Sequence, residues 1–209
     1  MSKLRVEGLG VHHLGPIDLM LDEGSCTCIS GASGAGKTLL LRALADMDEH
    51  TGDVLLNEVA CHDIIAPEWR RRVGLLPAEN PWWYDTVGQH FDGYKIEQSW
   101  LTDLGLKPSV MNSMANRLSS GERQRLSLLR LLSRQPKALL LDEPTHHLDT
   151  DNIKAAEQLI HEYCKQHKAP VLWVSHDPEQ IARVADRHYV LEQGKLIEAQ
   201  PMMINKDAV

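Results

Sequence analysis

A glycine-rich octapeptide is the segment of this sequence best suited to chemistry. Residues 31–38 read GASGAGKT, in which small residues lead to a lysine and a threonine. Backbone N–H groups of such a loop wrap phosphate oxygens, Lys37 would neutralise β- and γ-phosphates, and the Thr38 hydroxyl would bind Mg²⁺. We therefore predict that the whole loop binds phosphate, namely Gly31, Ala32, Ser33, Gly34, Ala35, Gly36, Lys37 and Thr38.

The flanks of this loop support the prediction. The run CTCIS (26–30) is strand-like and the run LLLRALADM (39–47) is helix-like. The loop would then lie between a strand and a helix N-terminus, where the helix dipole favours anionic phosphates. A glycine-rich surface turn is the alternative, but it does not account for the strand–loop–helix order.

Two further apolar runs also end in reactive residues. ALLLD (138–142) leads to Glu143, VLWVSH (171–176) ends at His176, and the helix-like stretch 151–167 separates them. Continuous apolar strands that alternate with helices indicate a parallel sheet buried on both faces. Ligands bind at the carboxyl ends of such strands, so we expect the three reactive clusters to converge on one crevice.

The acidic pair at the second strand end has two expected roles. Asp142 directly follows apolar residues, the position from which an acid holds Mg²⁺ or its water ligand together with Thr38. Glu143 is placed to act as general base toward the water that attacks the γ-phosphate, provided it lies within hydrogen-bond reach. Adjacent acids are commonly only solvated surface, but an acid pair that ends a buried strand is seldom so.

The composition of the chain excludes several classes of protein. The chain has 209 residues, 43% hydrophobic and 24% charged, which is ordinary for a globular protein. No apolar run approaches a membrane span, and the N-terminus lacks the apolar core of a signal peptide, so we expect a cytoplasmic protein. The net charge of −7 argues against a nucleic-acid partner, because phosphate backbones call for a basic surface.

The cysteines and histidines show no ligand spacing. Cys26, Cys28, Cys61 and Cys164 contain no CxxC pair, and the eleven histidines are scattered. We expect buried or free thiols rather than a disulfide framework or a metal site.

The segment LSSGERQ (118–124) can begin a helix. Ser119 or Ser120 can cap it, Gly121 lets a backbone N–H approach an anion closely, and Glu122 suits the first turn. From the residues alone this is either a second anion-binding helix N-terminus or a cap without a ligand. The chain nevertheless resembles, over essentially its whole length, the nucleotide-binding subunit of ABC transporters, through GASGAGKT, LSSGERQ, LLLDEP (139–144), HHLD (146–149) and VSHD (174–177) in that order.

That resemblance implies how the parts work. It implies ATP hydrolysis with Mg²⁺, with catalytic roles for Glu143, His176 and Lys37, where His176 contacts the γ-phosphate and senses hydrolysis. Residues 118–122, including Ser119, Ser120, Gly121 and Glu122, would close over the ATP of a second subunit in a homodimer. Leu148 and Asp149 would join the two sites. A separate integral membrane permease would hold the protein on the cytoplasmic face of the cell membrane.

The fold that this family implies is α/β. We expect one P-loop NTPase domain of the ABC-ATPase type over residues 1–209, with a mostly parallel sheet and an antiparallel β subdomain. Its core would comprise residues 1–77 and 136–209, and residues 78–135 would form an inserted helical lobe. Further strands are expected at 4–7, 17–21, 53–57 and 71–77, turns at Asn57-Glu58 and Gln193-Gly194, and the clearest helix at 126–134.

The sequence departs from the family at three places. Ala78 stands where a glutamine normally helps to bind Mg²⁺ and the attacking water, and Glu79 is the neighbour that could reach in. Ser120 replaces a usual glycine, which is milder because the backbone N–H remains. The segment that normally supplies an aromatic ring to adenine is short here, and we name His12 for that role.

Three consecutive aromatic residues suggest a docking surface. Neither a helix nor a strand can bury Trp82, Trp83 and Tyr84 on one face, and exposed aromatic patches tend to be interaction anchors. In the family this stretch receives the permease's coupling helix, so we expect docking here. A small core for the helical lobe is the alternative, which suits Phe91 and Trp100.

We therefore interpret the chain as an ATPase that dimerises on ATP and drives a permease. Within the family it most resembles the bacterial Fet-type ATPase of iron export, through its short length and the DTV that follows the aromatic run (85–87). One rival is a non-transport ABC ATPase acting on DNA or ribosomes, although such proteins usually carry two cassettes, a coiled-coil insertion or a basic face. Another is a regulatory subunit with weak hydrolysis, suggested by Ala78.

Overall fold

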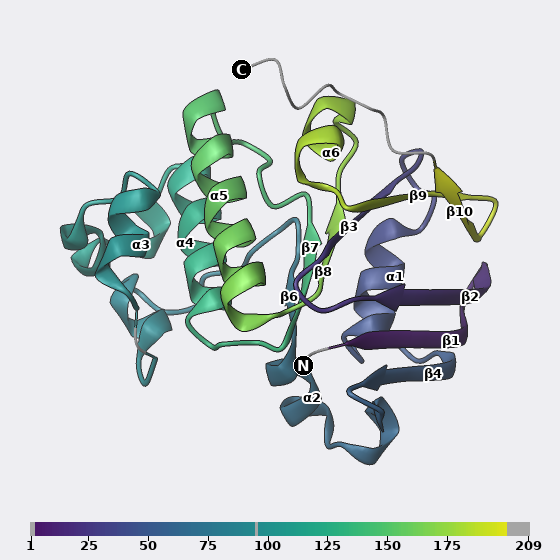
Figure 1. The fold of residues 1–209 in the computed structure, drawn as a ribbon. Coiled ribbons are helices and arrows are strands. Elements are labelled where there is room, and N and C mark those ends of the chain that lie inside the picture. The colour runs from purple at the N-terminus through teal and green to yellow at the C-terminus, as the bar shows by residue number, and fades with distance from the viewer. Residues whose placement is uncertain (1–2, 95, 200–209) are drawn as a thin grey trace.

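A four-stranded antiparallel sheet and a six-stranded, mostly parallel sheet organise the protein (Figure 1). The structure is a computed structural model that describes residues 3–94 and 96–199. The antiparallel sheet has the order β2-β1-β4-β5 and comprises β1 (Leu4–Val11), β2 (Leu14–Leu21), β4 (Thr51–Leu56) and β5 (Val59–Ala60). Ile17, Leu19 and Leu21 of β2 alternate into the core as predicted. The expected turn at Asn57 and Glu58 joins β4 to β5, and both residues have positive φ.

The larger sheet carries the three strands expected to lie together. Its order is β10-β9-β3-β8-β7-β6, from β3 (Cys26–Ser30), β6 (Val73–Leu76), β7 (Ala138–Asp142), β8 (Val171–Val174), β9 (Arg187–Glu192) and β10 (Lys195–Ala199). Strands β6, β7, β8, β3 and β9 run parallel, whereas β10 pairs antiparallel with β9. Strands β7 and β8 are buried throughout, which explains their continuous apolar sequence.

Two hydrophobic cores lie on the two faces of this sheet. The helices are α1 (Lys37–Leu44), α2 (Ala66–Arg72), α3 (Gln98–Asp103), α4 (Ser120–Leu132), α5 (Thr150–His167) and α6 (Pro178–Val184). Helices α4 and α5 cover one face, and α1 fills the space between the other face and the antiparallel sheet (Figure 1). Leu139 and Leu141 of β7 enter the first core while Leu140 enters the second. Parallel strands thereby gain apolar packing on both sides.

Two local predictions need correction. Residues 71–77 were expected to form a strand, but Arg71 and Arg72 end α2 and β6 begins at Val73. The helix has a proline in its first turn and three arginines in its last, the arrangement that the helix dipole favours.

Residues 78–135 are less helical than expected. Among residues 78–94 and 96–135, the structure shows α3, α4 and the 3₁₀ helices Gly88–Phe91, Pro108–Asn112 and Ala115–Arg117. Prolines and side-chain contacts, rather than helical periodicity, shape residues 77–94. Among residues 3–94 and 96–199, none of the helices combines the length and hydropathy needed to span a bilayer.

Candidate active site

The predicted phosphate loop lies between β3 and α1, as its flanks indicated. Gly31, Gly34 and Gly36 all have positive φ, at 149°, 79° and 103°, so the loop follows a path that other residues enter only with strain. A Cβ atom on Gly31 would lie 2.5 Å from the carbonyl oxygen of Leu191. Glycine is therefore required at Gly31 both by conformation and by space.

Lys37 is the first residue of α1 and folds back over the loop. Its Nζ donates hydrogen bonds to the carbonyl oxygens of Gly31 at 2.8 Å and Ala32 at 3.0 Å. The ammonium group therefore stands at a helix N-terminus where phosphates are favoured. This is the placement that charge neutralisation of a bound triphosphate requires.

The structure brings together the two residues predicted to bind Mg²⁺. The Thr38 hydroxyl donates to Oδ2 of Asp142 at 2.6 Å, although the residues are far apart in sequence. Burial raises the pKa of Asp142, against the lowering effects of the Thr38 hydrogen bond and the Lys37 charge. No lysine, arginine or histidine of the described segments forms an ion pair with Asp142. A buried carboxylate beside a hydroxyl fits a small divalent cation, which favours oxygen ligands.

Glu143 is held at the neighbouring position in an unusual backbone conformation. Its φ is +48°, and its N–H donates to the carbonyl oxygen of Val174 at 3.1 Å. Its Oε1 lies 3.2 Å from Nδ1 of His176, and its Oε2 lies 3.7 Å from Nδ1 of His146. The carboxylate, whose side chain is 28% exposed, thus stands between histidines from two strand-end loops. The predicted convergence of Glu143 and His176 is confirmed in this geometry.

A buried polar network that we did not predict fixes these loops relative to each other. Gln180 of α6 donates to Oγ1 of Thr145 at 2.8 Å and accepts from the Ser175 hydroxyl at 2.9 Å. All three side chains are buried. The network therefore ties the loop that carries Glu143 to the loop that carries His176. The sequence does show polar residues directly after the buried strands, which could have indicated such a network. It does not show that these residues are buried, because their burial depends on packing between distant segments.

The segment at the start of α4 forms a capping box. The N–H of Glu122 donates to the Ser119 hydroxyl at 3.2 Å, and the N–H of Ser119 donates to Oε2 of Glu122 at 2.9 Å. These hydrogen bonds from Ser119 lower the pKa of Glu122. A Cβ on Gly121 would contact the His147 carbonyl at 3.4 Å. Within the described residues, no hydrogen bond or ion pair joins Ser119, Ser120, Gly121 or Glu122 to the phosphate loop.

The loop after β6 places Glu79 nearer to the metal residues than Ala78. Glu79 lines a cavity of about 470 Å³ together with Thr38 and Asp142. Ala78 lines the neighbouring cavity, of about 660 Å³, with Ser120 and Gln124. Glu79 is therefore the better candidate to substitute for the missing glutamine.

His12 lies in the turn between β1 and β2, with an exposed side chain and a φ of +51°. The next residues lead to Leu14, whose side chain packs so closely on the loop that a Cβ on Gly36 would lie 2.8 Å from it. The turn is thus adjacent to the phosphate loop. Stacking of His12 on adenine stays a prediction.

The three consecutive aromatic residues surround a buried histidine. The N–H groups of Trp83 and Tyr84 both donate to Nε2 of His90 at 3.0 Å, and Nδ1 of His90 donates to the Thr86 carbonyl. Burial lowers the pKa of His90, in keeping with a neutral ring. Trp82 packs against the core, whereas Trp83 is 58% and Tyr84 50% exposed. The expectation that the three could not all be buried is confirmed.

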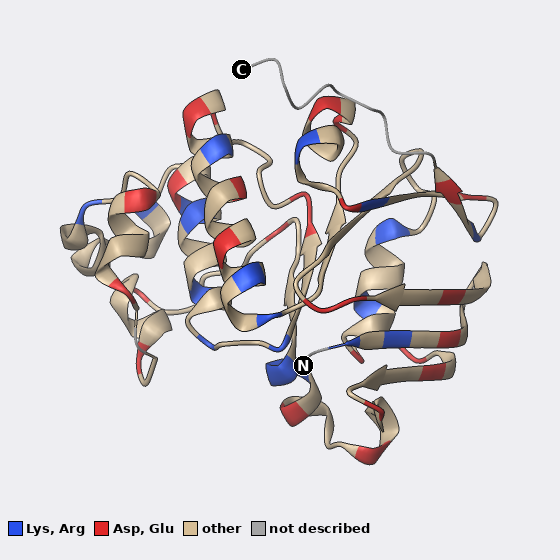
Figure 2. Ribbon diagram, viewed as in Figure 1, with Lys and Arg blue, Asp and Glu red and all other residues tan. Residues whose placement is uncertain are grey.

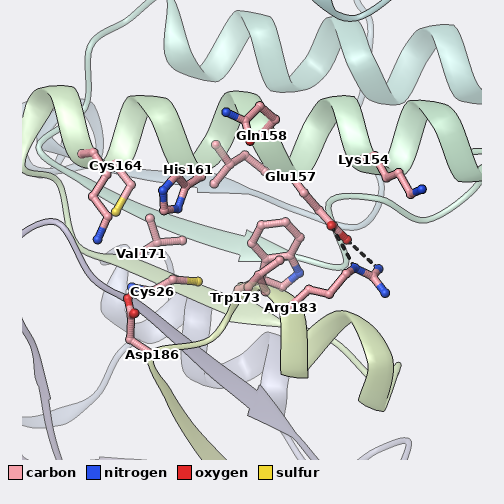
Figure 3. A pocket seen from close by; sticks show the side chains of 13 residues that line it. Cys26, Lys154, Glu157, Gln158, His161, Cys164, Val171, Trp173, Arg183 and Asp186 are labelled. Carbon is pink, nitrogen blue, oxygen red and sulfur yellow. Dashed lines mark hydrogen bonds and ion pairs between the residues drawn. The ribbon is translucent and has the colours of Figure 1, made fainter. Parts of the chain in front are cut away.

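A third cavity, of about 420 Å³, lies apart from the predicted phosphate and metal residues (Figure 3). It is bounded by α5, α6 and the neighbouring strands, and an ion pair between Glu157 and Arg183 at 2.9 Å lies at one side. Cys26 and Cys164 line it, and all four cysteines of the chain are free and buried as expected. Its lining shares no residue with the predicted phosphate and metal residues.

Comparison with known proteins decides the family. The ABC transporter family model matches residues 14–146 of this chain. The chain belongs to the ABC transporter family. The ATP-binding subunits of this family are ATPases, so this ABC protein binds and hydrolyses ATP, as the motifs predicted.

Curated relatives include ATP-binding subunits of both importers and exporters. The phosphate import protein PstB of Aeropyrum pernix is 33% identical over 96% of the ABC chain and 91% of its own length. The probable iron export protein FetA of Escherichia coli is 33% identical over 90% and 88%. The aliphatic sulfonates import protein SsuB 2 of Pseudomonas savastanoi is 36% identical over 87% of this chain, which spans 66% of that relative.

Solved structures confirm the ABC-ATPase fold. An ATP-binding subunit of an ABC transporter has a TM-score of 0.82 at 22% identity, over 94% of this chain and 89% of its own. A bacterial Atm1-family ABC exporter with ATP bound has a TM-score of 0.81 at 23% identity, over 94% of this chain and 38% of its own. At these identities the likeness concerns the fold alone.

Proposed function

We propose that two copies of this ABC ATPase close around ATP and drive a separate membrane permease, with hydrolysis performed by the cluster described above. The observation that carries the chemistry is the meeting of Thr38, Asp142, Glu143 and His176 beside the phosphate loop. These residues come from three neighbouring strand ends, so one bound triphosphate can reach them all.

Each side chain then has a distinct task. Lys37 neutralises phosphate charge, and Glu143 accepts a proton from the water that attacks the γ-phosphate. His176 would contact the same phosphate, and its 3.2 Å contact with Glu143 supports a role in keeping the carboxylate oriented. Thr38 and Asp142 would hold Mg²⁺, which offsets the negative charge of the phosphates when bound.

The position of the segment 118–122 supports the proposed dimerisation. The capping box leaves the N–H groups of Ser120 and Gly121 without a hydrogen-bond partner among the described residues. Helix N-terminal N–H groups bind anions, yet within the described residues no hydrogen bond joins this segment to its own phosphate loop. We propose that it binds the ATP held by a second copy. Gel filtration with and without ATP tests this step, and a monomer under every condition would contradict it.

The permease would dock at the groove beside the aromatic residues. The cavity of about 470 Å³ is lined by apolar side chains such as Met47 and Trp83 and by the cations Arg130 and Arg134. Arg130 stacks on Trp82 and Trp83, with its guanidinium 4.7 and 4.9 Å from the ring centroids. Such docking would place the protein on the cytoplasmic face of the membrane. Its test is co-purification from membranes: recovery together with a multi-span membrane protein would support docking, and recovery without one would contradict it.

Iron is the cargo that we propose. The support is the likeness to the probable iron export protein FetA, which aligns with this chain over 88% of its own length. Phosphate is the competing cargo, because PstB is similar at the same identity. Reconstitution with the permease separates them: iron should raise ATP turnover, and stimulation by phosphate alone would overturn the proposal.

One other function has a specific observation behind it. The alanine at position 78 would suit a regulatory subunit that switches with ATP but hydrolyses it slowly. Turnover near zero with and without the permease would favour that function. For a nucleic-acid ATPase we see no support, since acidic and basic residues are interspersed along α5 (Figure 2) and the net charge is −7.

A further inference from the structure

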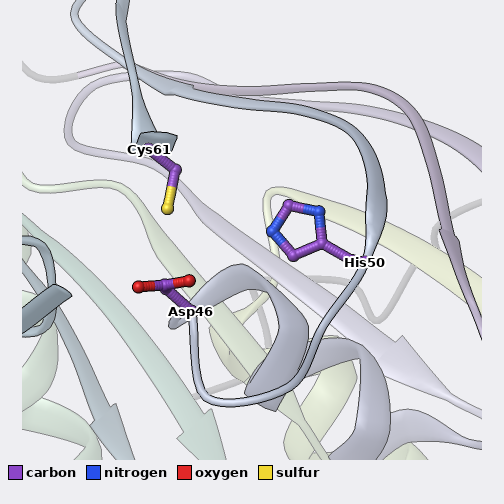
Figure 4. Close-up of side chains that lie close together, drawn as sticks. All are labelled: Asp46, His50 and Cys61. Atoms are coloured by element: carbon purple, nitrogen blue, oxygen red, sulfur yellow. The ribbon is translucent and has the colours of Figure 1, made fainter. Parts of the chain in front are cut away.

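Three potential metal ligands meet on the opposite side of α1 from the phosphate loop. Asp46 follows the end of α1, His50 precedes β4, and Cys61 begins the turn after β5. One ligand atom from each residue lies within 4.8 Å of the other two (Figure 4). The residues come from separate segments, so their meeting is a product of the fold rather than of sequence spacing.

The backbone around Asp46 directs this side chain. Asp46 has a φ of +56° and ends α1: its N–H donates to the Ala43 carbonyl, and the N–H of Met47 donates to the Arg42 carbonyl at 2.9 Å. Arg70 donates from Nε to the Asp46 carbonyl at 3.1 Å. The nearest approach of Arg70 to the carboxylate is 3.9 Å. The guanidinium thus mainly orients the backbone and leaves the carboxylate available.

His50 is oriented in the manner of a metal ligand. Its Nδ1 donates a weak hydrogen bond of 3.4 Å to the carbonyl of Thr51. This leaves Nε2 unprotonated, and Figure 4 shows the ring turned toward Cys61 and Asp46. Metal-bound histidines almost always donate their other ring nitrogen in this way.

The negative charge after the C-terminus of α1 also favours binding of a cation. Three acidic residues, Asp46, Asp48 and Glu49, follow the C-terminus of α1, where the helix dipole disfavours negative charge. Asp48 is satisfied by two hydrogen bonds of 2.7 Å from Arg42. Among the described residues, the Asp46 carboxylate forms an ion pair only with Arg70, at 3.9 Å. A bound cation would offset the charge that remains.

We propose that Asp46, His50 and Cys61 bind a divalent transition-metal ion of the zinc class. One thiolate, one imidazole and one carboxylate suit Zn²⁺ and Co²⁺, whereas Mg²⁺ and Ca²⁺ bind oxygen ligands. The three residues line a cavity of about 660 Å³, from which water can supply a fourth ligand. Ligand atoms on tetrahedral zinc lie roughly 3.5 Å apart, given bonds of about 2.0 to 2.3 Å, so small side-chain rotations complete the site. From the cysteine spacing alone we expected buried or free thiols rather than a metal site.

Two features of Cys61 decide how the site is tested. Cys61 belongs to the hydrophobic core, so the assay has to distinguish a metal-bound thiolate from a packed thiol. Burial raises the pKa of the Cys61 thiol to about 11, so metal binding must displace one proton. The assay therefore has to detect the metal–sulfur bond itself.

Co²⁺ titrated into the nucleotide-free protein provides that readout. We expect a thiolate-to-cobalt charge-transfer absorption, which Zn²⁺ abolishes by displacement. Asp46→Asn, which tolerates the positive φ, and His50→Gln should each weaken Zn²⁺ binding by at least about a hundredfold, because loss of a direct ligand should cost no less than the largest effects seen for residues that only orient a ligand. Cys61→Ser should remove the absorption.

Matched controls are available in the same chain. Cys164→Ser removes another buried thiol, and His62→Gln removes an exposed histidine that lines the same cavity; both should keep the absorption and the Zn²⁺ affinity. Failure of the wild-type protein to develop the absorption would overturn the proposal, as would its persistence in Cys61→Ser. The site is independent of ATPase activity, so either result leaves the proposed function untouched.

Discussion

Replacement of Glu143 by glutamine tests the proposed chemistry most directly. Glutamine keeps the side-chain oxygen that accepts from His176 at 3.2 Å, but it cannot take a proton from water. A positioned general base commonly contributes about 10²–10⁴-fold to rate. At about 1.36 kcal/mol for each factor of ten, the variant loses about 2.7–5.4 kcal/mol of transition-state stabilisation.

The cost to folding should be much smaller. The two histidines beside Glu143 have side chains that are 67% and 50% exposed, so any charge interaction with the carboxylate is screened by solvent. Such pairs contribute about 0–1 kcal/mol to stability. The melting temperature should therefore hardly change while turnover falls at least about a hundredfold.

Phosphate release and gel filtration with ATP and Mg²⁺ measure the two consequences. Glu143→Gln should bind ATP, hydrolyse it slowly and accumulate as a dimer, because one negative charge facing the phosphates is gone. Glu179→Gln, at the exposed start of α6, is the matched control and should behave as wild type. A Glu143→Gln protein that stays monomeric and hydrolyses at the wild-type rate would refute the assignment.

Five other substitutions test the loop after β6, the aromatic residues and His90. Glu79→Ala should lower turnover if Glu79 substitutes for the missing glutamine, and Ala78→Gln should raise turnover; no change in either steady-state rate would exclude this loop from the chemistry. Trp83→Ala should leave the melting temperature intact but weaken permease recovery about thirtyfold, the effect of losing an anchor of about 2 kcal/mol. Trp82→Ala, which removes a ring packed on the core, should instead cost about 3 kcal/mol of folding stability; thermal melts that rank the two the other way would contradict this division. His90 has a lowered pKa, so its contribution to stability is present above about pH 6.5 and is lost as the pH falls through that value, because the unfolded chain then binds the extra proton. His90→Asn should remove this part of the pH dependence in denaturant titrations, and an unchanged pH profile would show that His90 is not its source.

The sequence predicted best where residue type and position are tied by local physics. Strand β7 is buried on both faces, so its continuous leucines predicted a strand and marked Asp142 as the residue at its end. The same holds for the glycines of the phosphate loop, whose positive φ only they adopt freely. The family motifs then supplied roles that spacing alone could not.

What the sequence did not predict depends on contacts between distant segments. In the loop after β6, His90 accepts hydrogen bonds from the backbone N–H groups of Trp83 and Tyr84, contacts that no periodicity reveals. Gln180 is buried because α6 returns to the loops of Ser175 and Thr145. Helix α2 is a different case: its proline and arginine signals were present in the sequence, but Arg71 and Arg72 were read as the start of a strand.

The backbone of Glu143 has a consequence for how this protein could change. A residue other than glycine or asparagine at a φ of +48° costs of order 1 kcal/mol. Selection for thermal stability alone would therefore tend to replace the glutamate with glycine, and in a gene copy released from its task no selection for hydrolysis would retain the glutamate. A glutamate that persists in this conformation among descendants of this sequence would mark lineages in which hydrolysis is still under selection.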